Sequence, residues 1–256
     1  MRALLVQPDL HWHAPGDNFA AIERLLRDAG QPLDLCILPE MFSTGFTMAP
    51  GDCPPDTGER SLTQLRTWSL AYGAVCASTI YPVEGGWANR MFFVADGEVL
   101  GHYDKRHLFG LAGETEVYRA GPPAPVIVTY RGVRFLLQVC YDLRFPVTSS
   151  NAGGAYDVAL YVASWPSARR AHWTALLRAR AIENQAYVLG VNRVGHDGND
   201  LDYAGDSVAF GPLGETLADL GNAAGAEVVT LDAEHLRSTR ARLPFLRDAD
   251  AFTLAE

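Results

Sequence analysis

Cysteine is scarce in this chain of 256 residues, which contains four: Cys36, Cys53, Cys76 and Cys140. Four widely separated cysteines cannot supply a dense disulfide framework, and no CxxC pair provides the start of a zinc knuckle. We therefore expect the thiols to be reduced and the protein to reside in the cytoplasm.

Other signatures of cofactor binding are also missing. His11 and His13 form the one closely spaced histidine pair, and a solvated loop explains them better than a metal site, because no acid follows at typical ligand spacing. A glycine-rich nucleotide fingerprint is absent as well. The sequence therefore predicts a protein that uses no metal and no other cofactor.

Long apolar runs and an excess of positive charge are the remaining absences. The apolar run at residues 3–6 ends at Gln7, too early for a signal peptide, and no other run approaches the length of a membrane span. Lys and Arg number 21 against 30 Asp and Glu, which gives a net charge of −9. Because binding to nucleic-acid phosphates requires a basic face, we do not expect nucleic acid as a partner. We expect a soluble protein that binds neither membranes nor nucleic acids.

Strand and helix patterns do alternate along the chain, which is typical of an α/β fold. No repeat or linker divides it, so we expect one domain over residues 1–256. Expected strands lie at 3–7, 33–38, 74–80, 158–163, 187–192, 207–211 and 227–231, and expected helices at 17–29, 59–72, 168–183 and from Pro146 onward. Two hairpins are expected, at 91–95 with 98–103 and at 126–130 with 133–139. This pattern allows two stacked sheets or a single mixed sheet.

Three segments each place a reactive side chain at the end of an apolar run: Glu40 in LPEMFSTGF, Lys105 in HYDKRHLF and Cys140 in LLQVCYDLRFP. Ligands of open α/β sheets bind at the carboxyl ends of the strands. Taken singly, the cysteine is most often a small core residue, and the two charged groups are most often solvated. Their occurrence together favours a catalytic set.

These segments, together with SWPSARRAHWTALLRARAIENQAYVLGVNRVG and YAGDS, resemble the nitrilase superfamily of carbon–nitrogen hydrolases, and within it the bacterial omega-amidase branch. The resemblance extends from VQPDL to Pro244 and Phe245. It implies a four-layer α-β-β-α sandwich, commonly doubled into a homodimer through helices that follow the cysteine strand. It also implies a Glu, Lys, Cys triad that needs no catalytic imidazole.

The resemblance assigns a role to each reactive residue. Cys140 is expected to be the nucleophile and Glu40 the group that moves protons. Lys105 and the backbone N–H of Tyr141 are expected to stabilise the oxyanion. Glu114 resembles an accessory glutamate that orients Lys105 or the substrate amide, and Glu116 is the alternative in the same segment.

Substrate contacts are expected from Arg144 and from several aromatic residues. Arg144 lies four positions after Cys140 and can pair with a substrate carboxylate, although an ion pair with Asp142 or Glu183 fits the sequence equally well. The expected pocket walls, for which core packing is the alternative, are Phe42, Phe46, Trp165, His172 and Tyr203.

The function expected from this resemblance is an omega-amidase. Such an enzyme cleaves the terminal amide of a small molecule, 2-oxoglutaramate or also 2-oxosuccinamate, to a dicarboxylate and ammonia through a cysteine thioester. Another aliphatic amidase or an N-carbamoyl hydrolase with the same triad is the alternative within this enzyme class. A Cys-His hydrolase using His172 or His196, and a non-catalytic ligand-binding or scaffolding protein, are the alternatives outside it.

Overall fold

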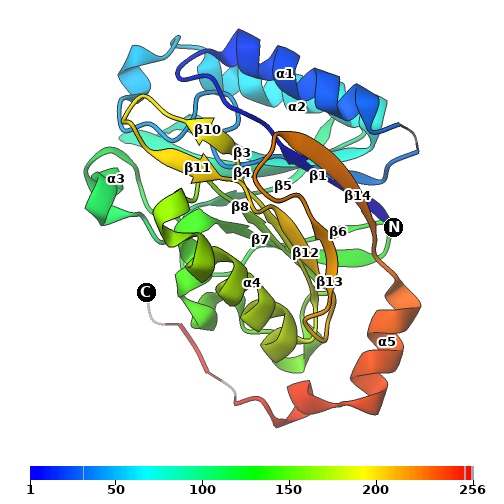
Figure 1. The fold of residues 1–256 in the computed structure, drawn as a ribbon. Coiled ribbons are helices and arrows are strands. Elements are labelled where there is room, and N and C mark those ends of the chain that lie inside the picture. The colour runs from blue at the N-terminus through cyan, green and yellow to red at the C-terminus, as the bar shows by residue number, and fades with distance from the viewer. Residues whose placement is uncertain (31, 251, 255–256) are drawn as a thin grey trace.

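Two six-stranded sheets form the centre of the molecule (Figure 1). This computed structural model describes residues 1–30, 32–250 and 252–254. The first sheet has the order β14 (Gly225–Thr230), β1 (Arg2–Gln7), β2 (Leu35–Ile37), β3 (Ala74–Val83), β4 (Gly86–Ala95) and β5 (Glu98–Asp104). The second has the order β13 (Thr216–Asp219), β12 (Val208–Phe210), β9 (Tyr187–Val191), β8 (Val158–Val162), β7 (Val133–Val139) and β6 (Ile127–Tyr130).

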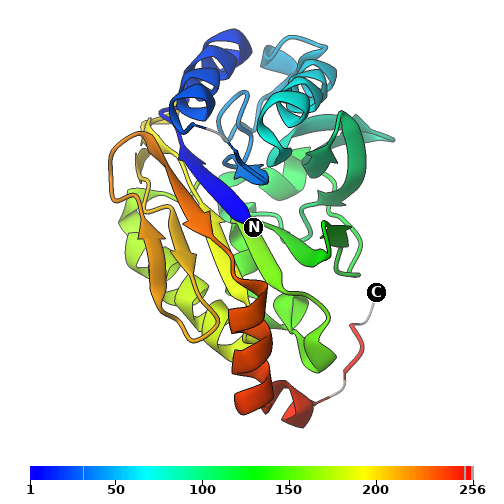
Figure 2. The same ribbon diagram turned by 90° about the vertical axis from the view of Figure 1, so that its right-hand side faces the viewer.

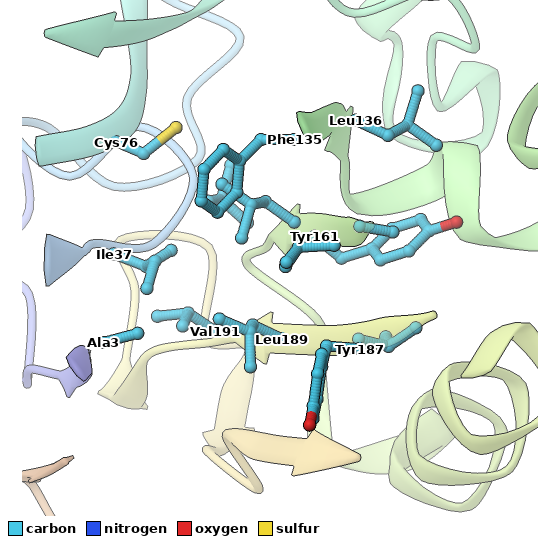
Figure 3. Close-up of a cluster of buried hydrophobic side chains, with 14 of the residues drawn as sticks. Ala3, Ile37, Cys76, Phe135, Leu136, Tyr161, Tyr187, Leu189 and Val191 are labelled. Carbon is cyan, nitrogen blue, oxygen red and sulfur yellow. The ribbon is translucent and has the colours of Figure 1, made fainter. Parts of the chain in front are cut away.

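The two sheets pack face to face through apolar side chains. Ala3, Ile37 and Cys76 from the first sheet lie against a cluster from the second that includes Phe135 and Val191 (Figure 3). Side chains alternate along β1, so Ala3 and Leu5 face this inner core while Leu4 and Val6 face the helices outside. Burial on both faces explains why the central strands read as continuous apolar runs.

Helices cover the outer faces of both sheets (Figures 1 and 2). The pair α1 (Pro15–Asp28) and α2 (Thr57–Tyr72) packs on the first sheet through residues such as Ile22 and Trp68. The second sheet is covered by α4 (Arg170–Asn184), and α5 (Ala233–Arg242) follows β14. The expected α-β-β-α sandwich is thereby confirmed, and the alternative of a single mixed sheet is wrong.

Strand direction brings the expected site residues to one edge of the sandwich. The strands β1, β2 and β3 are parallel to one another, as are β7, β8 and β9, so their carboxyl ends point the same way within each sheet. The two expected hairpins are confirmed, β4 with β5 and β6 with β7. In the first turn Asp96 and Gly97 have φ of 52° and 80°, as a tight hairpin requires.

Several local expectations were wrong. Only a 3₁₀ turn, Pro146–Ser149, forms where a helix was expected, because serine, asparagine and glycine follow within a few residues and interrupt it. A further hairpin joins β3 to β4, since both strands are longer than expected. The elements that sequence patterns did not indicate are short or polar: α3 (Glu114–Val117), β10 (Val194–His196), β11 (Asp202–Ala204), β13 and α5. No helix in the described residues is long and apolar enough to cross a membrane.

Candidate active site

Glu40, Lys105 and Cys140 meet at one end of the sandwich, each just beyond a strand. Glu40 follows β2 by three residues, while Lys105 and Cys140 directly follow β5 and β7. The Lys105 ammonium donates hydrogen bonds to Glu40 Oε1 and to Glu114 Oε2, both at 2.8 Å. The structure therefore brings together all four side chains for which the sequence predicted catalytic roles.

Glu40 is fully buried and receives hydrogen bonds from three directions. Besides Lys105, the backbone N–H of Ser164 donates to Oε2 at 2.8 Å and the amide of Asn89 donates to Oε1 at 2.8 Å. Burial raises the pKa of Glu40, and the negative charge of Glu114 adds to this rise, while Lys105 opposes it. A carboxylate with a raised pKa is suited to accept and return a proton.

Glu114, rather than Glu116, occupies the site. Glu114 is the first residue of α3 and its side chain is buried. It accepts one hydrogen bond from Lys105 and a second from the backbone N–H of Phe109, the latter at 2.6 Å. Glu116 is exposed. The geometry thus decides between the two acids that the sequence left open.

Asn89 is a site residue that the sequence analysis did not identify. It lies fully buried on β4, and its amide group donates both to Glu40 and to Glu114 Oε1, the latter at 3.2 Å. The side-chain oxygen of Asn89, Oδ1, accepts a hydrogen bond from the Ser78 hydroxyl at 2.8 Å. The sequence signal was a lone amide within an apolar strand, which does not by itself indicate a neighbouring carboxylate.

Cys140 begins a 3₁₀ turn, Cys140–Arg144, at the end of β7. Its φ of 47° lies in the left-handed region, which is uncommon for residues other than glycine and here turns the chain sharply at the thiol. Burial raises the pKa of Cys140, and the adjacent Glu40 raises it further. Tyr141 is the second residue of the turn, so its N–H has no acceptor within the helical pattern and is available to a ligand.

Asp142 ties this turn to the loop that carries Lys105. Its buried carboxylate accepts hydrogen bonds from the backbone N–H of Val139 at 3.0 Å and from the Tyr103 hydroxyl at 2.9 Å. It also contacts His107 Nδ1 at 2.7 Å and accepts from the His107 backbone N–H at 3.0 Å. The positions of the thiol and the ammonium are therefore linked through one side chain.

The charge on Lys105 is maintained by its neighbours. Burial disfavours an ammonium, but Glu114, Glu40 and Cys140 together raise the pKa of Lys105 well above its ordinary value. With both glutamates ionised, two negative charges surround one positive charge. The cluster can therefore take up a proton while Lys105 remains a hydrogen-bond donor.

A cavity of about 450 Å³ lies over Cys140 and Lys105. Phe46, Phe109 and Trp165 contribute aromatic walls, and Tyr203 and Leu201 come from the β10–β11 hairpin. The charged side chains that line it are all cationic, namely Lys105, Arg144 and Arg169, and no carboxylate is among the described lining residues. Such a cavity suits an anionic ligand with an apolar middle.

The residues expected to contact substrate have different outcomes. Arg144, Trp165 and Tyr203 line the cavity, as does Phe46. Phe42 does not, because it packs against Phe19 and Trp68 between the first sheet and its helices, with ring centroids 5.8 and 5.9 Å away. His172 is exposed outside the cavity and contacts Arg144 at 3.2 Å.

The alternative ion pairs of Arg144 do not form. Asp142 contacts His107 instead, and Glu183 forms an ion pair with Arg180 at 2.9 Å. Arg144 instead lies over the Trp165 ring, 4.8 Å from its centroid. Its guanidinium therefore retains donors for a ligand.

Neither of the histidines considered as a catalytic base, His172 and His196, takes part in the cluster around Cys140. His172 and His196 do not line the cavity, and the exposed His196 pairs with Asp202 at 3.5 Å. His13 contacts the Thr47 hydroxyl at 2.8 Å. Within the described part of the chain, no group of three or more His, Cys, Asp or Glu side chains is arranged to hold a metal ion.

Known proteins resemble this chain over nearly its full length. Omega-amidase YafV of Yersinia enterocolitica is 45% identical, with 99% of this chain and 98% of that protein covered. The 2-oxoglutaramate amidase of Bacillus subtilis (strain 168) is 29% identical, with 95% of each covered. The family model of carbon–nitrogen hydrolases matches residues 2–241.

Solved structures share the fold. XC1258 from Xanthomonas campestris, a CN-hydrolase superfamily protein with an arsenic adduct in its active site, has a TM-score of 0.93 at 38% identity, covering 100% of this chain and 99% of that one. An amidase variant from Nesterenkonia sp. AN1, with acrylamide added at its active-site cysteine, has a TM-score of 0.83 at 28% identity, covering 96% and 98%. This chain thus belongs to the carbon–nitrogen hydrolase family and is a hydrolase of non-peptide carbon–nitrogen bonds in linear amides.

Proposed function

We propose that this hydrolase is an omega-amidase that converts 2-oxoglutaramate, and also 2-oxosuccinamate, to a 2-oxo dicarboxylate and ammonia. The observation that carries the proposal is the cavity, in which the Cys140 thiol and the Glu40, Lys105 and Glu114 cluster lie beside two arginines that pair with no carboxylate of the described residues. An omega-amide with a free carboxylate at its other end matches both features. The names of the two curated relatives support the same substrate class.

In the proposed acylation step Glu40 takes the proton of the Cys140 thiol as sulfur attacks the amide carbonyl carbon. The oxyanion that forms accepts hydrogen bonds from Lys105 and the N–H of Tyr141, and removing such a donor typically costs about 3–4 kcal/mol. Glu40 then gives its proton to the amide nitrogen, the carbon–nitrogen bond breaks and ammonia leaves. The acyl group remains on Cys140 as a thioester.

Deacylation uses the same groups a second time. Glu40 removes a proton from a water molecule as its oxygen attacks the thioester carbonyl, and Lys105 again stabilises the oxyanion. Collapse of this intermediate expels the Cys140 sulfur, which takes the proton from Glu40. The product leaves as the carboxylic acid, which still carries the second hydrogen of the water and loses it to solvent to give the carboxylate. Glu114 holds the Lys105 ammonium in place through the 2.8 Å hydrogen bond without itself contacting the reacting carbon.

Ammonia release from a panel of amides tests this proposal. The panel contains 2-oxoglutaramate, 2-oxosuccinamate, neutral aliphatic amides of matched length and N-carbamoyl amino acids. We expect the highest kcat/KM on the two 2-oxo amides. A preference for neutral amides would instead support an aliphatic amidase, preference for the carbamoyl compounds an N-carbamoyl hydrolase, and no turnover with any of them a binding protein.

We further propose that the enzyme is cytoplasmic and forms a homodimer through the outer side of α4 and the 3₁₀ turn Pro146–Ser149. Ile182 on α4 is 50% exposed and Val147 is 49% exposed, so an apolar contact is available there. The described cysteines are all free, as reduced cytoplasm requires. Sedimentation equilibrium of the wild-type protein and of an Ile182→Glu variant tests the dimer, which the variant is expected to weaken.

A further inference from the structure

Arg169 lines the same cavity as Cys140, although the sequence analysis did not single it out. It ends the 3₁₀ turn Ser167–Arg169, which directly precedes α4. Arg144 reaches the cavity from a different element, the turn that begins at Cys140. Two guanidinium groups from separate parts of the chain therefore face one space.

Neither of these arginines is paired with an acid among the described residues, whereas other arginines are. Arg90, Arg134 and Arg170 each bind an aspartate at 2.6–2.7 Å. Arg144 and Arg169 instead lie over aromatic rings, with centroid distances of 4.8 Å to Trp165 and 5.4 Å to Phe109. A guanidinium that lies over a ring is held by its face, which leaves N–H groups at its edge for a ligand. In Arg144 one of these nitrogens, Nη2, contacts His172 Nδ1 at 3.2 Å and the others remain available.

Trp165 connects the two arginines to each other. Its ring carries Arg144, and its indole N–H donates to the backbone carbonyl of Arg169 at 2.9 Å. The Trp165 backbone is bound on both sides by the amide of Asn192, at 2.8 and 3.0 Å. Trp165 also directly follows Ser164, whose N–H binds Glu40, so the arginines are fixed relative to the groups around the thiol.

We propose that Arg144 and Arg169 form one paired-arginine subsite, which binds the 2-oxo acid end of the substrate while its amide lies at Cys140. This inference rests on the proposed omega-amidase function and adds the residues that select the substrate. A carboxylate has about four lone-pair positions. One bidentate arginine occupies two of them, and a second arginine can bind the remaining positions together with an adjacent 2-oxo oxygen, an extra acceptor that a simple carboxylate does not offer. The subsite therefore selects 2-oxo acids over simple carboxylates.

Three amides of equal chain length separate these contributions: 2-oxoglutaramate, glutaramate without the oxo group, and neutral pentanamide. We expect Arg169→Ala to lower kcat/KM for 2-oxoglutaramate by roughly tenfold or more, the usual value of a hydrogen bond to a charged group. Its effect on glutaramate should be smaller, and pentanamide should change by less than about twofold. Arg144→Ala should show the same order of substrates.

Arg170→Ala is the matched control, because Arg170 adjoins Arg169 in the chain but pairs with Asp206 and does not line the cavity. It should leave all three substrates unchanged. Because both arginines bind one anionic group, the loss in the double variant should differ from the product of the single losses. Equal losses on all three amides, or no loss on 2-oxoglutaramate, would overturn the paired-arginine subsite.

Inhibition by 2-oxoglutarate distinguishes failure of the subsite from failure of the proposed function. The dicarboxylate is tested as a competitive inhibitor of pentanamide hydrolysis, and we expect Arg169→Ala to raise its inhibition constant. If the wild type hydrolysed only neutral amides but showed this Arg169-dependent inhibition, the omega-amidase proposal would fail and the subsite would stand. Absence of inhibition in the wild type would reject the subsite itself.

Discussion

At the scale of single residues, the cluster around Lys105 balances burial against charge. An unpaired ion in a protein interior is costly, and removing one partner of a buried pair typically costs about 3–5 kcal/mol. Here one ammonium is shared by Glu40 and Glu114, and Asn89 adds a neutral donor to both carboxylates. The site thus holds one ammonium and two carboxyl groups out of water, each with hydrogen-bond partners, without a second cation.

Cys140→Ala should abolish amide hydrolysis and leave the fold intact, because the change removes one sulfur atom from a small buried side chain. Ammonia release and thermal unfolding measure the two effects. Cys76→Ala is the matched control, since this cysteine is also buried but lies in the core between the sheets, and it should retain activity. Normal turnover by Cys140→Ala would reject Cys140 as the nucleophile.

Asn89→Ala should move the acidic limb of the kcat/KM profile to higher pH. The Asn89 amide donates to the charged form of Glu40 and therefore favours it, so removing the donor adds to the rise in pKa that burial already causes. In the proposed mechanism Glu40 must be ionised to accept the thiol proton, so the free variant enzyme should reach full activity only at a higher pH. A lower plateau with an unmoved limb would give Asn89 a purely structural role.

At the scale of elements, the turn that carries Cys140 depends on contacts with β5 and the loop after it. Tyr103 lies on β5 and His107 two residues beyond Lys105, and both bind Asp142. The left-handed φ of Cys140 is tolerated because the turn is held from several sides. Strain at the thiol is therefore sustained by contacts between the two sheets rather than by the turn alone.

Asp142→Asn tests this dependence. An amide has one acceptor oxygen where the carboxylate has two, so at least one of the buried donors loses its partner, at a cost of about 1–3 kcal/mol. We expect lower stability in urea and a lower kcat, because both the thiol and Lys105 lose a common support. Asp104→Asn is the control, as Asp104 pairs with Arg90 on a partly exposed part of the first sheet. An equal loss of kcat in both variants would argue against a specific role for Asp142.

At the scale of the whole molecule, a net charge of −9 contrasts with a cavity whose charged lining is cationic. The overall charge repels an anionic substrate at a distance, but salt screens that repulsion beyond about 8–10 Å. A ligand inside the cavity lies within this screening length of the arginines. We therefore expect local charge, rather than the overall balance, to govern which amide binds.

Activity should survive exhaustive chelation and dialysis, and alkylation of thiols should eliminate it. In the proposed reaction Cys140 is the nucleophile, Glu40 carries the protons and Lys105 donates to the oxyanion, so no step requires a cofactor. Ammonia release before and after each treatment is the measurement. Recovery of a chelated, inactive enzyme on addition of Zn²⁺ alone would contradict this scheme.

The sequence by itself determined the α/β class and indicated three candidate catalytic residues at strand ends. Glu40, Lys105 and Cys140 could be recognised because each stands at the end of an apolar run within a distinctive segment, which is a local property of the chain. The hairpin turns were also predictable, since Asp96 and Gly97 adopt positive φ at little cost. The family resemblance extended this reading to an α-β-β-α sandwich, which the stacked sheets bear out.

Only the tertiary structure decided which neighbours these residues have. Ser164 reaches Glu40 from 124 positions away, and this contact exists only because one sheet is stacked on the other. The order of strands within the first sheet brings Asn89 to both acids, and the loop beyond β5 carries Glu114, rather than Glu116, to Lys105. Phe42 packs instead with the helices on the outer face of that sheet. Arg169 joins Arg144 because Trp165 contacts both. Side-chain periodicity records whether a residue is buried, but a partner distant in sequence is specified by how the layers pack.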